Sequence, residues 1–157
     1  MNLSRLFFAS VPDKSELESP NFPLHNAAAM TKQLIAIASA NGFLVVALGA
    51  FGAHSLESLI APSLLNTYNT GVEYHMYHAL ALFGTALLSI HYPNEKLLSL
   101  SACLFVLGIL LFSGSLYIFS LSEISWFGAT APIGGGLFLA AWGVLFWFAI
   151  GKTWRRL

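Results

Sequence analysis

The run GLFLAAWGVLFWFAI (residues 136–150) decides the fold, together with LLSLSACLFVLGILLF (residues 97–112). Both runs are apolar on every face of a helix, whereas the strands of a membrane barrel alternate apolar and polar residues over about ten positions. Lipid offers backbone groups no partner, so a helix, which pairs its own N–H and C=O groups, is favoured over an open strand. The two runs therefore predict membrane-spanning helices.

Intervals without Asp, Glu, Lys or Arg divide the rest of the chain in the same way. A hydrocarbon core about 30 Å thick needs about 20 helical residues, and each of four such intervals is long enough to cross once and too short to cross twice: 33–56, 74–94, 97–122 and 124–151. We therefore expect an all-α membrane protein, an antiparallel four-helix transmembrane bundle with helices at about 34–53, 74–90, 97–120 and 132–150.

The composition excludes several other classes of protein. Of 157 residues, 57% are hydrophobic and only 9% are charged, whereas an average soluble domain has about 25% charged residues. The net charge of zero excludes the basic surface of a nucleic-acid-binding protein. A single cysteine, Cys103, excludes an internal disulfide framework and a cysteine-rich metal site.

The basic residues predict the orientation, because Lys and Arg gather on the cytoplasmic side of a membrane protein. With four crossings, the loops 54–73 and 121–131 lie on one side and contain glutamates but no Lys or Arg. All seven basic residues lie on the other side: Arg5, Lys14, Lys32, Lys96, Lys152, Arg155 and Arg156. We expect a multi-pass protein with both termini in the cytoplasm.

Residues 1–29 are set apart from the four-span membrane domain, which is assigned to residues 30–157. The apolar part after Arg5 is only LFFA before Val11, shorter than the roughly 7 to 15 residues that a secretory signal needs. Two interpretations remain: a disordered cytoplasmic N-terminal extension, or a mis-assigned start, with translation beginning at Met30.

Small residues recur at helical spacing in every expected span. Such stripes let helix backbones approach closely in lipid, where no hydrophobic effect drives helices together. Helix packing is therefore the role predicted for Gly42, Gly49, Gly52, Gly108, Gly136 and Gly143.

Polar residues are expensive inside a membrane, so their positions carry information. Because alternate helices reverse direction, polar stretches of all four helices reach the outer third of the bundle, and we expect a hydrogen-bonded cluster there. Its predicted members are His54, Glu73, Tyr74, His78 and Tyr117, with Ser113 and Ser115 nearby. If His78 pairs only with a hydroxyl, the cluster is structural; if Glu73 reaches His54 or His78, it titrates near neutral pH and serves as a proton or cation sensor.

Single polar residues also have simpler explanations. His75 and His78 are spaced as a weak metal pair, but a buried histidine bonded to a neighbouring hydroxyl or carbonyl is the interpretation we favour, and no metal is expected. Asn41, deep in the first span, predicts an interhelical hydrogen bond. The segment 61–69 is interpreted as a short helix lying on the outer surface.

No catalytic motif is present: the sequence contains no GxSxG, Walker loop, HExxH or CxxC. We therefore expect no catalytic residues, no cofactor and no enzymatic activity. Two functions remain open, a non-enzymatic accessory or interaction protein and a small transporter or sensor that uses the polar cluster. The expected partners are the lipid bilayer and another membrane protein or a second copy of the chain.

Four runs resemble a known family: ALGAFGAH (47–54), TGVEYHMYHALALFG (70–84), LFSGSLY (111–117) and APIGGGLFLAAWG (131–143). They are similar to the domain of unknown function 423 family, the YgdD-like and YwdK-like small membrane proteins. The resemblance implies a four-span protein of the bacterial plasma (inner) membrane with no established activity, and a start near Met30. In the family pattern the position of His75 is often another residue such as Gln, which weakens the metal interpretation.

Overall fold

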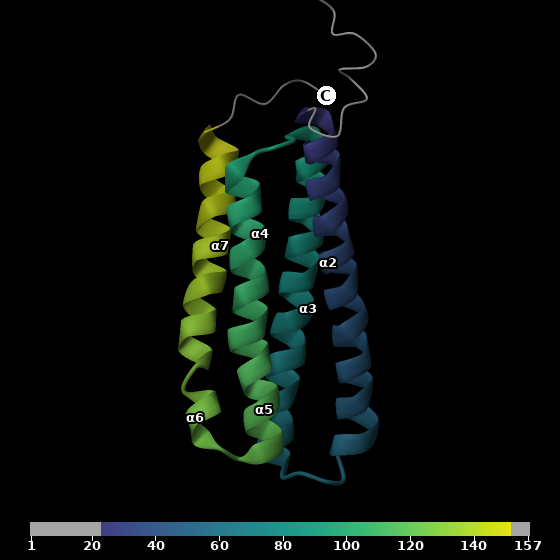
Figure 1. The fold of residues 1–157 in the computed structure, drawn as a ribbon. Coiled ribbons are helices and arrows are strands. Elements are labelled where there is room, and N and C mark those ends of the chain that lie inside the picture. The colour runs from purple at the N-terminus through teal and green to yellow at the C-terminus, as the bar shows by residue number, and fades with distance from the viewer. Residues whose placement is uncertain (1–22, 152–157) are drawn as a thin grey trace, which may run out of the picture.

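The computed structural model describes residues 23–151, and side chains from Ala29 onward. Within this part of the chain every regular element is helical. Figure 1 shows long helical rods lying side by side. In chain order the elements are α2 (Pro23–Phe51), η2 (Gly52–Leu56), α3 (Pro62–His91), α4 (Lys96–Gly108), η3 (Ile109–Ser113), α5 (Gly114–Ser122), α6 (Ser125–Gly128) and α7 (Ala131–Gly151), where η2 and η3 are π-helical turns.

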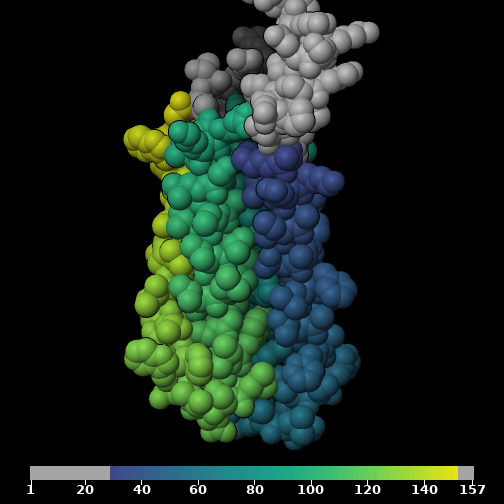
Figure 2. Space-filling view, viewed as in Figure 1, coloured from purple at the N-terminus to yellow at the C-terminus, as the bar shows by residue number. Residues whose placement is uncertain are grey.

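Helix α3 lies between the other rods. The main neighbour of α2 is α3, which also contacts α4, η3 and α5 on another side, while α7 packs against α4 and η3. In Figure 2 the green α4 and α5 separate the yellow end of α7 from the blue α2. The two outer rods, α2 and α7, therefore each rest on the inner helices and leave much of their own surface uncovered.

Hydrogen bonds join the ends of neighbouring rods. Near the start of α2, the Ser89 hydroxyl at the end of α3 donates to Oγ1 of Thr31 at 2.9 Å. Near the other end of α2, the Tyr68 hydroxyl at the start of α3 donates to the Leu48 carbonyl at 2.9 Å. In Figure 1 the start of α2 and the start of α4 lie at one end of the molecule and α6 lies at the other.

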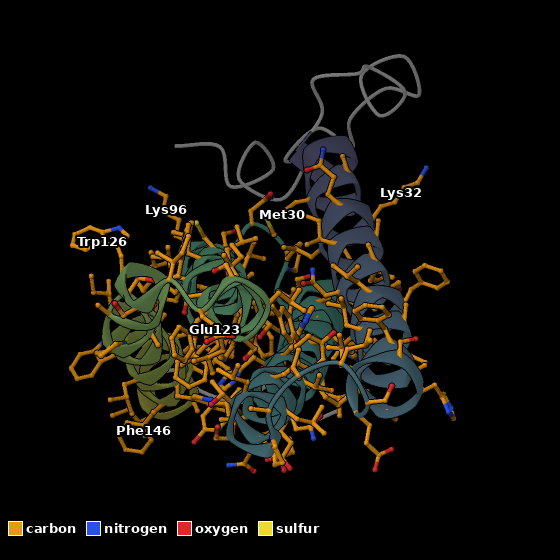
Figure 3. All side chains as sticks on the ribbon, turned by 90° about the horizontal axis from the view of Figure 1, so that it is seen from below. Met30, Lys32, Lys96, Glu123, Trp126 and Phe146 are labelled. Carbon is orange, nitrogen blue, oxygen red and sulfur yellow. The ribbon has the colours of Figure 1, made fainter. Side chains whose placement is uncertain are left out.

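Three stretches of the described chain are long and apolar enough to cross a membrane: Ala29–Leu56, Lys96–Ser122 and Ser125–Gly151. Helix α3 is long enough, at 30 residues, but its histidines, tyrosines and polar first turns lower its hydropathy. Apolar side chains point outward from the rods, as expected for lipid contact: Phe43 and Leu139 are 79% and 77% exposed. Figure 3 shows Trp126 and Phe146 pointing away from the helices.

The interior is a compact apolar layer between the rods. Leu82 of α3 and Phe105 of α4 are fully buried. They belong to a cluster that joins all the long helices, made of Ala38, Leu82, Ala102, Phe105, Ile109, Phe138 and Ala141. This layer fixes the face that each helix turns toward its neighbours and so positions the polar side chains that share it.

Two helices begin earlier than the sequence predicted. Helix α2 begins at Pro23, so residues 23–29 of the predicted disordered extension are helical; residues 1–22 lie outside the described part. Helix α3 begins at Pro62, so the segment 61–69 is its first part and not a separate surface helix. Proline suits the first turn of a helix, where its missing N–H has no intrahelical acceptor to lose.

Half of the glycines predicted to pack do face another helix. An added Cβ on Gly49 would lie 3.3 Å from Val72, and one on Gly52 would lie 2.7 Å from the Tyr68 ring. A Cβ on Gly108 would overlap the ring of Phe138. These glycines allow α2 to approach α3 and α4 to approach α7.

The other three do not pack in this way, which corrects the sequence prediction. Apart from the adjacent residues and the nearby backbone of the same helix, no atom of the described residues lies within 4 Å of the Cβ position of Gly42, Gly136 or Gly143. All three belong to the outer rods α2 and α7, at positions that no other helix among the described residues approaches closely. The closest approach instead involves Gly134 of α7, where an added Cβ would overlap the backbone of Phe112 in η3.

Candidate functional site

A buried histidine connects three helices. His75 of α3 is 1% exposed. Its Nε2 lies 3.2 Å from Oδ1 of Asn41 in α2, and its Nδ1 lies 3.3 Å from the hydroxyl of Tyr117 in α5. We call Asn41, His75 and Tyr117 the histidine network. The interhelical hydrogen bond predicted for Asn41 is confirmed.

The hydrogen bonds fix the tautomer of His75. The Asn41 amide nitrogen donates to the Ile37 carbonyl at 2.8 Å, so the amide oxygen faces the imidazole and accepts from Nε2–H. In a neutral imidazole the other nitrogen is then an acceptor, and Nδ1 accepts from the Tyr117 hydroxyl. With the imidazole neutral, every group of the network thus has one direction of donation.

Tyr68 extends the network toward the end of α2. It is fully buried, and its hydroxyl donates to the Leu48 carbonyl. Its ring lies 4.9 Å, centroid to centroid, from that of Tyr117. Gly71, one turn along α3, makes room for this pair, because an added Cβ would lie 3.0 Å from the Tyr117 ring.

His78 lies apart from the histidine network. Its Nδ1 is 2.7 Å from the backbone carbonyl of Tyr74, one turn earlier in α3. Its ring stacks on that of Phe138 in α7, with centroids 3.4 Å apart and planes 5° from parallel. The sequence predicted Tyr117 and His78 in one cluster, whereas Tyr117 bonds to His75. The two histidines are three residues apart in α3, so their side chains face different neighbours.

The remaining predicted members occupy different surroundings. His54 in η2 and Glu73 in α3 are both exposed, so the structure does not bring them into the buried histidine network. Tyr74 is partly exposed, and its ring packs 4.6 Å from that of Phe112. The five residues expected in one cluster are therefore distributed between the exposed surface, the aromatic contacts of Tyr74 and His78, and the histidine network.

The two serines also differ from each other. The Ser115 hydroxyl donates to the Phe112 carbonyl at 2.8 Å, the local bond that a helical serine often makes. Ser113 is fully buried in η3, and its hydroxyl has no hydrogen-bond partner among the described residues.

The site joins side chains of three helices by hydrogen bonds. The described residues contain no group of three or more His, Cys, Asp or Glu side chains that is arranged to hold a metal ion. The network consists of an amide, a neutral imidazole and a phenol, all donating or accepting across helix interfaces. Such bonds set the rotation of one helix against the next, because a slip of one residue would bury each group without its partner.

Comparison with known proteins agrees with the motifs that surround this site. The family described as "Protein of unknown function (DUF423)" matches residues 48–135. The chain belongs to this family. It is 46% identical over 111 residues to the UPF0382 membrane protein YwdK of Bacillus subtilis, covering 71% of this chain and 90% of that protein.

Other DUF423 relatives are described in the same general terms. The UPF0382 membrane protein of Haemophilus influenzae is 38% identical, over 72% of this chain and 90% of its own length. The UPF0382 inner membrane protein YgdD of Escherichia coli K12 is 37% identical, over 74% of this chain and 88% of its own length. No solved structure matches the chain. The DUF423 chain described here is thus a membrane protein whose family carries no assigned activity.

Proposed function

We propose that this DUF423 chain crosses the membrane four times, as an antiparallel bundle with both termini in the cytoplasm. Helix α3 is the crossing that hydropathy alone does not select. Its polar side chains His75 and Tyr68 are buried and bonded to other helices, so they need not meet lipid. Lys96 begins α4 at the end of the molecule where α2 also begins (Figure 1), which supports that end as the cytoplasmic one.

Reporter fusions or cysteine labelling at three positions test this topology. Ser58 lies between α2 and α3, and Asn94 lies between α3 and α4. Ser58 is expected outside the cell, and Asn94 and the C-terminus inside. An Asn94 that is labelled from outside would exclude the four-span arrangement.

For function, we propose a non-enzymatic accessory protein that binds another membrane protein. The observation that carries this proposal is the histidine network, in which both nitrogens of His75 are occupied by groups of the protein itself. A polar group used in this way stabilises one arrangement of helices, and its ring nitrogens have no free hydrogen-bonding position for a solute. The outer rods supply surfaces for a partner, since α2 rests mainly on α3 and presents Phe43 outward.

The alternative is a small transporter or sensor that uses the polar residues of the outer half. It requires a titrating carboxylate in contact with a buried histidine, and the exposure of Glu73 and His54 favours the accessory role over it. The two functions differ in what accompanies the purified protein.

Co-purification from native membranes in a mild detergent separates the two functions. We expect a membrane protein that remains bound in stoichiometric amount and is lost when Phe43→Ala removes the outward side chain of α2. Phe146→Ala on α7, an equally apolar exposed position, is the matched control for general loss of surface hydrophobicity. Protein that elutes without a partner and moves a solute in liposomes would reverse the assignment.

A further inference from the structure

A groove opens on the side of the molecule between α3, η3 and α7. Its volume is about 500 Å³, within the roughly 300 to 1,000 Å³ typical of pockets that hold small ligands. Leu139 and Trp142 of α7 line it and are exposed on the lateral surface. In a membrane protein a lateral opening of this kind faces hydrocarbon, so a ligand would enter from the lipid.

The walls of the groove are aromatic. Tyr74, Phe112 and Phe138 contribute rings from three elements, and the Tyr74 ring lies 4.6 Å from that of Phe112 and 6.5 Å from that of Phe138. Gly136 also lines the groove, and no atom lies within 4 Å of its Cβ position. An aromatic ring fits such a space by offset or edge-to-face contact with the walls.

One buried polar side chain lines this apolar groove. His78 is 7% exposed and contributes to the wall. Its Nδ1 is bonded to the Tyr74 carbonyl, which can only accept, so Nδ1 carries the proton. In the neutral ring Nε2 is then an acceptor, and the described residues provide it with no donor.

Stacking keeps this acceptor in place. The ring of His78 lies parallel to that of Phe138, and the bond to Tyr74 holds its other edge against its own helix. The free edge is therefore presented in one orientation, and a ligand that satisfies it must bring an O–H or N–H donor. A simple alkyl chain of a lipid would fill the space but leave Nε2 without a partner.

We propose that this groove binds a lipid-soluble phenol, whose hydroxyl donates to Nε2 of His78 while its ring packs among the aromatic side chains of the wall. The inference is independent of the accessory role, because it concerns a face of α3 and α7 away from the outward side of α2. It also assigns His78 a role distinct from that of His75, whose nitrogens both bond within the protein.

Two probes that differ only in the donor test the proposal: 1-naphthol and 1-methoxynaphthalene. The full chain is placed in phosphatidylcholine nanodiscs, and binding of radiolabelled probe is measured by equilibrium dialysis, with empty nanodiscs as the correction for partition into lipid. We expect 1-naphthol to bind about tenfold more tightly, the ratio that one net hydrogen bond supplies. Equal affinities would mean that the groove holds aromatic molecules without a hydrogen bond to their hydroxyl group, and would overturn the proposal.

Variants locate the binding. His78→Leu should bring the affinity for 1-naphthol down to that for the methyl ether and leave the ether unchanged. Gly136→Leu should abolish binding of both probes by filling the groove, whereas Gly143→Leu, on the same helix but outside the groove, should bind as the native chain does. If His78→Leu fails to fold, as judged by circular dichroism, the glycine pair decides: a preference for 1-naphthol that survives Gly136→Leu would refute the site.

Discussion

Replacing Gly134 by alanine should separate α7 from η3. A Cβ at this position would lie 2.7 Å from both Cα and Cβ of Phe112 and closer still to its backbone nitrogen. Ordinary van der Waals contact begins near 3.4 Å, so α7 would have to move by at least about 0.7 Å, a gap that forfeits a quarter to a half of the dispersion energy of each neighbouring atom pair. Two of these atoms are backbone and Cβ is bonded directly to it, so none of the three can rotate out of the way.

The substitution should lower the free energy of unfolding because other residues share this interface. Phe138 and Ala141 of α7 are buried against the inner helices and would move with Gly134. Overpacking of a well-packed interior costs about 1 to 3 kcal/mol of stability, and we expect Gly134→Ala to lower the free energy of unfolding by about 2 to 3 kcal/mol. Gly136→Ala adds the same methyl group two residues along, where nothing lies within 4 Å, so its effect should stay within about 1 kcal/mol.

The free energy of unfolding of the two variants can be measured in mixtures of dodecyl sulfate and a mild detergent, followed by circular dichroism and tryptophan fluorescence. The comparison matters more than either value, because both variants make the same change on one helix. If Gly134→Ala were as stable as Gly136→Ala, the close approach of α7 to η3 would not be a determinant of the fold.

Four further substitutions test the polar residues. His75→Leu should lower the free energy of unfolding by about 1 to 2 kcal/mol by leaving Asn41 and Tyr117 without partners. Tyr117→Phe should lower the free energy of unfolding less in the His75→Leu background than in the native chain. Full additivity of the two changes in this double-mutant cycle would exclude the network. Ser113→Ala should raise stability in the same assay by about 1 kcal/mol, because it removes a buried hydroxyl without a partner, and a loss would reveal an acceptor. Glu73→Gln should change stability by less than about 0.5 kcal/mol, as expected of an exposed side chain, and a larger loss would show that its carboxylate has a partner in the fold.

The helical character of the chain followed from simple physical patterns. Runs such as 97–112 are apolar on all faces and have no alternative to a helix in lipid. The start of α3 was harder to predict, because the polar residues between Pro62 and Tyr74 resemble a surface segment when read alone. They lie in the helix because Tyr68 is buried against α2, a tertiary contact that hydropathy does not register.

The candidate site was predicted at the level of helices and less well at the level of residues. Tyr117 and a histidine of α3 do meet, but the partner is His75 and not His78. The two histidines differ by three positions and so point about 60° apart around the helix, and choosing between them requires the rotation of α3 to within about a sixth of a turn. That rotation depends on the close contact of Gly71 with the Tyr117 ring, which a stripe of small residues does not distinguish from the open positions Gly42 and Gly143.

The π-helical turn at Ile109–Ser113 determines the direction in which each side chain of the following helix α5 points. Successive residues of an α-helix point about 100° apart, and a π-turn accommodates one additional residue without ending the helix. Counting regular turns from Lys96 would therefore misplace Tyr117 by about 100°, and only with the extra residue does its hydroxyl point at His75. A one-residue deletion here would rotate the whole of α5 by about 100° while leaving its composition unchanged.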